Sequence, residues 1–190
     1  VKEAKEKGAD FIKIMTTGLL DFNNHGQVTG TPLDKKEVRE MVHIAHEEGL
    51  AVMSHTNGVY GVQSAVEAGV DSVEHGNYID RETIEILADS ETVWVPTLVT
   101  IRNLRGCGRY DEKTIEPIIE LAEENLRLAW NCKAKVALGS DAGAYMVPHG
   151  TGILNEYNAF TEILGQSEAV CSWLADGEKR IQDTFRRPEY

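Results

Sequence analysis

Two histidines stand at equivalent points of two consecutive strand predictions. His55 follows the apolar run 50–53, His75 follows residues 71–74, and a glycine comes soon after each histidine. Residues 58–69 between them carry apolar side chains at helical spacing, so the two strands are expected to run parallel. Sites in parallel α/β proteins collect at the carboxyl ends of strands, where these two imidazoles could reach one metal ion. Each histidine could instead end its strand in an ordinary hydrogen bond, and the pattern leaves both interpretations open.

Two more candidate ligands follow the same logic. Lys13 lies within the apolar strand FIKIM, and Asp141 follows a strand over 135–138 in the motif GSDAG. A lysine in a strand can extend outward from a sheet edge, but burial would lower its pKa and make it nucleophilic. An aspartate between glycines is often a turn residue, and here it also stands at a strand end. Because GSDAG is not the GxSxG nucleophile elbow, a serine hydrolase is disfavoured.

An arginine-bearing loop is predicted over residues 102–111. It contains Arg102, Arg105 and Arg109, in a chain with 31 acidic against 19 basic residues. Guanidinium groups bind carboxylates through paired hydrogen bonds, so the loop is a candidate for anion recognition. Solvated surface charge is the alternative.

Three further histidines are predicted to lie on the surface. His25 falls in a long loop over 16–32, and His43 and His46 lie three apart on a helix over 34–49. Their order is not the HExxH of a zinc protease. Asp34 with Glu37 three residues later forms a capping box that starts this helix.

Five strands, each followed by a helix, make up the predicted architecture. The strands lie near 11–15, 50–54, 71–75, 93–99 and 135–140. Repeated βα units predict a parallel sheet, either doubly wound or part of a (β/α) barrel. The absence of GxGxxG and GxxxxGK[ST] motifs argues against nucleotide binding. Candidate ligands at the ends of four different strands favour the mouth of a barrel.

Composition narrows the function classes. The 190 residues suffice for one domain, and 42% hydrophobic with 26% charged residues is typical of a soluble globular protein. No apolar run is long enough to span a bilayer, and a net charge of −12 excludes nucleic acid and anionic membranes as partners. Three widely spaced cysteines without a CxxC motif, and no visible signal peptide, predict free thiols and a cytoplasmic location.

Four motifs in order, FIKIM, MSHTNG, SVEHGN and LGSDAG, resemble the later half of a metal-dependent amidohydrolase barrel. Imidazolonepropionase-like and prolidase-like metallo-dipeptidases are the most similar members. The resemblance covers residues 8 to about 165. It implies an α/β fold that is a partial (β/α)8 TIM-type barrel, with about five βα units corresponding to strands four to eight. Residues 1–190 would form one catalytic domain that lacks the amino-terminal part of the barrel.

The resemblance also implies a site and a reaction. Lys13 matches the lysine that becomes a carbamate bridging two metals, His55 and His75 match ligands of the second metal, and Asp141 matches the aspartate that binds the first metal and accepts a proton. The cofactor would be Zn²⁺, one or two per site, with other divalent metals possible. The reaction would be hydrolysis of a carbon–nitrogen amide bond of a dipeptide or another small molecule, as in a dipeptidase, a carboxypeptidase or an imidazolonepropionase relative. The arginine loop would hold the substrate's carboxylate.

Two departures from the family pattern limit this expectation. The HxH motif of strand one has no counterpart, and Thr17-Gly18-Leu19 replaces the usual glycine pair after the lysine strand. A non-catalytic fragment that retains the fold and one metal is therefore the alternative function. With open sheet edges and an incomplete first metal site, this chain alone is expected to bind at most one metal weakly, to form oligomers and to turn over negligibly. An upstream segment with three βα units and an HxH motif is expected to restore a second metal and activity together.

Overall fold

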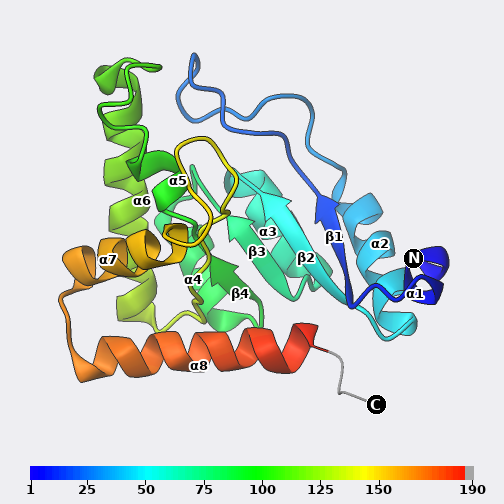
Figure 1. The fold of residues 1–190 in the computed structure, drawn as a ribbon. Coiled ribbons are helices and arrows are strands. Elements are labelled where there is room, and N and C mark those ends of the chain that lie inside the picture. Colours follow the sequence, from blue (N-terminus) through cyan, green and yellow to red (C-terminus); the bar gives the residue numbers. More distant parts are fainter. Residues whose placement is uncertain (187–190) are drawn as a thin grey trace.

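Four parallel strands form the sheet in the computed structural model of the chain, which describes residues 1–186 (Figure 1). They are β1 (Phe11–Met15), β2 (Ala51–Thr56), β3 (Ser72–His75) and β4 (Val93–Val95), and their order in the sheet is the order in the chain. A doubly wound sheet reverses its strand order at a switch point, whereas a barrel adds each strand beside the last. The sequential order therefore favours the barrel.

The helices follow the expected alternation closely. They are α1 (Lys2–Glu6), α2 (Lys35–Glu47), α3 (Val59–Ala68), α4 (Arg81–Asp89), α5 (Val99–Arg102), α6 (Glu112–Cys132), α7 (Gly152–Leu164) and α8 (Glu168–Phe185). Asp34 caps α2 in the predicted capping box, and Asp80 caps α4. These carboxylates satisfy backbone N–H groups that the first helical turn leaves unpaired. No helix in the described part of the chain is long and apolar enough to cross a membrane.

The core lies between one face of the sheet and the helices. Val52, Val73 and Trp94 point from successive strands into this layer and are almost fully buried, against apolar side chains of α2, α3, α4 and α6. Side chains alternate across a strand, so the opposite face carries a different set. The register aligns Met15 with His55, His55 with Glu74, and Glu74 with Val95. The opposite face thus carries His55 and Glu74 between the apolar side chains of Met15 and Val95.

The fourth strand is shorter than predicted. β4 ends at Val95 rather than near residue 99, because Pro96 has no N–H to donate to the ladder. Thr97 then takes a left-handed backbone conformation with φ of 50°, and α5 begins at Val99. The expected strand over 93–99 is therefore a strand followed by a short helix.

The predicted fifth strand forms only one parallel bridge, between Trp94 and Val136. The N–H of Trp94 donates to Lys135 O at 2.8 Å, and the N–H of Ala137 donates to Trp94 O at 3.0 Å. The position of the segment beside β4 is as predicted, but a regular strand is not formed. The cause is the short partner: β4 has only three residues with which to pair.

Helix α8 crosses the amino ends of the strands and closes that side of the molecule (Figure 1). Gly177 lies so close to the segment after β4 that a Cβ there would overlap the carbonyl oxygen of Val136. Ile181 packs on the apolar cluster of the inner sheet face, and Phe185 meets Phe11 edge to face at 5.4 Å between ring centroids. At Gly177, α8 and the segment that carries Val136 thus lie too close together to admit a side chain.

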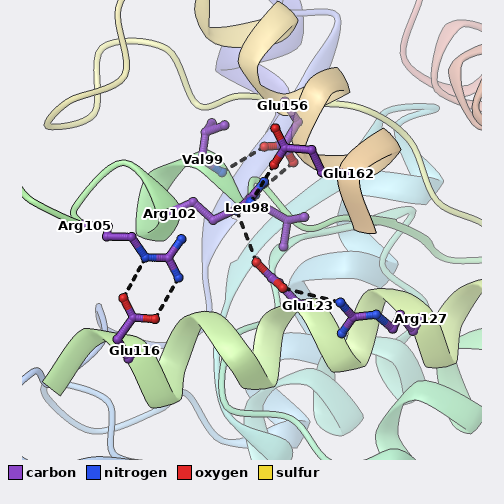
Figure 2. Close-up of polar contacts among 9 residues, drawn as sticks. All are labelled: Leu98, Val99, Arg102, Arg105, Glu116, Glu123, Arg127, Glu156 and Glu162. Atoms are coloured by element: carbon purple, nitrogen blue, oxygen red, sulfur yellow. Dashed lines mark hydrogen bonds and ion pairs between the residues drawn. The ribbon is translucent and has the colours of Figure 1, made fainter. Parts of the chain in front are cut away.

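Helix α7 is joined to α5 by a buried carboxylate. Glu156 is fully buried and accepts hydrogen bonds from Leu98 N at 2.8 Å and Val99 N at 2.9 Å (Figure 2). Burial raises the pKa of Glu156 to about 7, although the two backbone donors and Arg102 oppose this shift. Folding thus raises the pKa of this carboxyl group, while both of its oxygens still accept backbone N–H bonds.

We predict that Gly177→Ala destabilises the chain. Alanine has the higher helix propensity, by ~1 kcal/mol, but its Cβ would force α8 away from Val136, and overpacking typically costs about 1–3 kcal/mol. Thermal unfolding measures the difference. Ser172→Ala, at an exposed position of the same helix, is the control and should change stability little. An unchanged or higher melting temperature for Gly177→Ala would contradict the close packing.

A second prediction concerns pH and Glu156. A carboxyl group whose pKa is raised on folding contributes stability below pH 4.5, its ordinary value, and this contribution disappears as pH rises to about 7. The unfolding free energy of the wild type minus that of Glu156→Gln should thus fall across this window, by on the order of 3 kcal/mol. Denaturant unfolding at several pH values measures it.

Glu116→Gln is the matched control for the pH experiment. Its hydrogen bond with Arg105 lowers the pKa of Glu116, so the corresponding difference should stay nearly constant above pH 4.5 and should fall only as the pH drops below 4.5. Unfolding free energies of wild type and Glu156→Gln that change in parallel with pH would show that folding does not raise the pKa of Glu156.

Candidate functional site

A cavity of about 410 Å³ opens at the carboxyl ends of the strands, and all four predicted ligands line it. They are Lys13 from β1, His55 from β2, His75 from β3 and Asp141 from the loop after the bridged segment. The rest of the wall is largely apolar, with two asparagines: Met15, Leu19, Leu20, Phe22, Asn57, Asn77, Thr100, Ile101, Leu104, Tyr110, Ala144 and Tyr145. The fold thus gathers residues that lie far apart in the sequence into one hollow.

His55 is held in one tautomer by a backbone carbonyl. The side chain is 6% exposed, and its Nε2 lies 3.2 Å from the carbonyl oxygen of Gly18. Because a carbonyl can only accept, Nε2 must carry the proton, which leaves the lone pair of Nδ1 free in the neutral ring. Burial lowers the pKa of His55, as does the charge of Lys13, while Gly18 and Asp141 act in the opposite direction.

His75 is held from two sides. Its Nδ1 lies 2.7 Å from Thr97 Oγ1, and Trp94 Nε1 donates to its backbone carbonyl at 2.9 Å. The pKa of His75 is lowered to about 3, first by burial and then by the charges of His55 and Lys13. The two histidine rings lie 4.6 Å apart between centroids, at an angle of 66°. The site therefore presents two adjacent imidazoles that are neutral at physiological pH.

Lys13 and Asp141 face the cavity from its open side. Both are exposed, so the burial expected for Lys13 is not found in this chain. The reason is its position on β1, which pairs only with β2 in this sheet. Within residues 1–186, no group of three or more His, Cys, Asp or Glu side chains converges closely enough to hold a metal. The histidines form a pair, and the other two candidates share its cavity.

The donor set of the histidine pair suits a divalent metal. A metal-binding histidine normally gives its second ring N–H to a carbonyl or another acceptor, which fixes the tautomer. His55 shows this arrangement with Gly18, and His75 would show it if Nδ1–H donates to Thr97. Neutral imidazoles combined with oxygen ligands are typical of zinc sites. The histidine pair therefore has the chemistry of two ligands of the implied metal, and the other two candidates share its cavity.

Backbone strain is concentrated at the same edge of the sheet. His75, Thr97 and Asp141 have positive φ angles of 72°, 50° and 53°. Such conformations in residues other than glycine cost about 1–3 kcal/mol each and cluster at functional sites. Thr97 stands out because β-branched residues rarely adopt this region. The strain supports a functional assignment for this edge.

Sequence reasoning overlooked two asparagines and a buried acid. Asn57 Oδ1 accepts from the N–H and the Nδ2 of Asn77, at 3.0 and 3.2 Å, which ties the two strand ends together. The repeated spacing His-x-Asn, in HTN and HGN, is the signal that could have identified them. Glu74 is buried beside His55 and accepts from Ser72 Oγ at 2.6 Å, and burial raises its pKa to about 7.

The three arginines of the predicted recognition loop differ in their surroundings. Arg102 lies between Glu123 and Glu162, and Arg105 forms a bidentate pair with Glu116, at 2.6 and 2.7 Å (Figure 2). Neither lines the cavity. Arg109 instead stacks over two aromatic rings of the cavity wall, with Cζ 4.7 Å from the Tyr145 centroid and 5.3 Å from that of Tyr110.

Of the three arginines, Arg109 is therefore the one that contacts residues of the cavity wall. It makes no salt bridge with a carboxylate in the described part of the chain. His25, His43 and His46 lie on the surface as predicted, where His46 Nε2 lies 2.8 Å from Asp71 Oδ2 and the ring of His25 meets that of Tyr78 edge to face.

Comparison with known sequences identifies related proteins. A sequence model of the amidohydrolase family matches residues 1–170. Ochratoxinase from Aspergillus niger is 28% identical over 141 residues, which are 71% of this chain and 29% of that protein. An uncharacterised protein of Mycobacterium tuberculosis is 29% identical over 119 residues, covering 60% of this chain and 32% of the relative. This chain thus spans about a third of the length of these curated relatives.

Solved structures share the fold. A Xaa-Pro dipeptidase with bound methionine superimposes with a TM-score of 0.75 at 27% identity, over 96% of this chain and 46% of that one. A prolidase in complex with N-methylphosphonate-L-proline gives 0.74 at 26% identity, over 95% and 45%. The A. niger ochratoxinase structure gives 0.76 at 22% identity over 94% and 41%, and supports the fold alone. The predicted partial TIM-type barrel is confirmed by these similarities.

Proposed function

The chain belongs to the amidohydrolase family, and on this premise we propose that it forms part of a metal-dependent hydrolase of carbon–nitrogen amide bonds. The observation that carries the proposal is the histidine pair. His55 and His75 are buried, neutral and 4.6 Å apart, in one cavity with Lys13 and Asp141. These residues come from β1, β2, β3 and the loop after the bridged segment, and imidazole and carboxylate groups at this edge of a barrel are the donors that a zinc site uses.

The proposed ligands are His55, His75, Lys13 as a carbamate, and Asp141. A zinc ion bound there would polarise the substrate carbonyl and lower the pKa of a water towards ~7. The neutral rings of His55 and His75 need no deprotonation before they bind a cation, because burial already lowers their pKa values. The electrostatics of the cavity thus support the proposed role.

Asp141 is the proposed proton carrier. Its carboxylate accepts a proton from water as the water oxygen attacks the amide carbon, and it returns this proton to the nitrogen as the C–N bond breaks. The products are a carboxylate and an amine. Its place on the exposed side of the cavity, in a loop with positive φ at Asp141, leaves room for a substrate between it and the histidines.

The cavity wall supports a substrate with an apolar group and a free carboxylate. Leu20, Phe22 and Ile101 belong to the apolar wall, and Arg109 lies over the aromatic rings at its border. The related solved structures are named as a Xaa-Pro dipeptidase and a prolidase, and a curated relative is ochratoxinase. A dipeptide or an N-acyl amino acid is therefore the proposed substrate class.

The first test measures metal binding, which does not require turnover. The chain should bind about one equivalent of Zn²⁺, and His55→Ala and His75→Ala should each lose it, since each removes one of two adjacent ligands. Metal analysis after gel filtration gives the stoichiometry. His43→Ala, an exposed histidine on α2, is the control and should bind zinc as the wild type does. If His55→Ala and His75→Ala both retained zinc, zinc binding by this histidine pair would be excluded.

Catalysis is tested separately from metal binding. Zinc-dependent binding of a phosphonate analogue of a dipeptide should be detectable by calorimetry for the chain itself. Turnover is assayed for the chain and for the chain extended by an amidohydrolase strand with the HxH motif. Hydrolysis should appear in the extended protein and be lost in Asp141→Asn. Zinc binding without phosphonate binding or turnover in either form would favour the non-catalytic alternative.

We further predict that Arg109→Gln raises KM for substrates with a free carboxylate, but not for the corresponding amides. The loss of one charge-assisted hydrogen bond, worth about 1.5–3 kcal/mol, corresponds to a factor of about 10 to 100. Steady-state kinetics on the extended protein measures it. Arg105→Gln, which removes only a surface pair with Glu116, should leave both KM values unchanged. Equal effects of Arg109→Gln on acids and amides would contradict the prediction.

A further inference from the structure

The orientation of His75 depends on a residue outside every recognised motif. Its Nδ1 meets Thr97 Oγ1 at 2.7 Å, and Thr97 is 3% exposed. Thr97 follows Pro96, which has no N–H, and it lies beyond the end of β4. The strand ladder therefore does not hold the backbone of Thr97, whose φ is 50°. The restraint must come from the residues that follow.

The two residues after Thr97 are fixed by a carboxylate from another helix. Leu98 N and Val99 N each donate to a different oxygen of Glu156, at 2.8 and 2.9 Å (Figure 2). Two bonds to successive amides set both the position and the direction of this peptide. Glu156 itself is fully buried in α7, so its side chain has little freedom.

The far end of α5 is anchored independently. Arg102 lies between Glu123 of α6 and Glu162 of α7, and Asn103 Nδ2 donates to the carbonyl oxygen of Met146 at 2.9 Å. Met146 is in the loop that also carries Asp141. The far end of α5 is thus linked to the loop of Asp141, and the residue before α5, Thr97, bonds the candidate ligand His75 directly.

We propose that Glu156 is a positioning residue of this site: by holding Leu98 and Val99 it sets Thr97, whose hydroxyl aligns the ring of His75. The pathway has three steps: the carboxylate of Glu156 accepts from two backbone amides, the peptide bond joins Leu98 to Thr97, and the Thr97 hydroxyl meets the His75 ring. The importance of the alignment for a metal rests on the proposed function, but the alignment itself can be tested in the metal-free chain.

The test follows each step by NMR in the metal-free chain near neutral pH. Amide hydrogen exchange reports the bonds of Leu98 and Val99, and ring ¹⁵N shifts report the tautomer of His75. Glu156→Gln should speed exchange at both amides and shift His75 towards mixed tautomers. It should fold, because glutamine has similar volume and carries no charge. Thr97→Val should shift His75 alone, and Thr97→Ser should restore the wild-type signal.

Two comparisons separate positioning from general stability. His55, which bonds Gly18, should keep its signals in every variant. Glu162→Gln, on the same helix as Glu156 and also an Arg102 partner, should leave the His75 signals unchanged. Zinc affinity, measured by competition with a chromophoric chelator, should fall about 10-fold or more in Glu156→Gln and Thr97→Val only.

Three results would overturn the proposal. The first is a wild-type His75 signal in folded Glu156→Gln. The second is an equal change at His55 and His75, which would indicate a general loss of packing. The third is an unfolded Glu156→Gln, which would assign Glu156 to the stability of the whole fold. Altered NMR signals with unchanged zinc affinity would support the alignment and count against the proposed metal role of His75.

Discussion

The register between β2 and β3 is the constraint on which the site depends. His55 pairs with Glu74, and Thr56 pairs with His75, so both imidazoles emerge at one end of the sheet. Side chains alternate with a period of two, and a shift of one residue would send His55 into the apolar layer that Val52 and Val73 now fill. Burial of that layer therefore fixes the face on which His55 lies, whereas His75 has the strand parity of Val73 and departs from regular strand geometry with a φ of 72°.

The features that could be predicted from the sequence depend on residues close together in the chain. The capping box of Asp34 and Glu37 and the glycines around 59–68 act within one helical turn, so the sequence alone indicated where α2 and α3 begin and end. The two histidines could be assigned to one end of the sheet because a helix between two strands makes them parallel. The gathering of four candidate ligands followed from this regularity.

The features that could not be predicted depend on contacts between residues far apart in the sequence. The fifth segment depends on how many residues β4 offers, and Pro96 limits that number. The exposure of Lys13 depends on which strands flank β1. Glu156 lies in an ordinary amphipathic helix, and only the folded chain shows that it meets the backbone of Leu98. Each of these features depends on residues far away in the sequence, where periodicity carries no information.

Several features around the candidate site are unfavourable for folding. Three residues around the cavity hold positive φ angles, and the buried acids Glu74 and Glu156 have pKa values raised to about 7. These terms oppose folding, and the apolar layer on the other face of the sheet must offset them. A surface that needed only stability would not retain them. Strain, buried acids and neutral imidazoles meet at one edge of the sheet, and this coincidence is the strongest physical argument that the edge was selected for chemistry.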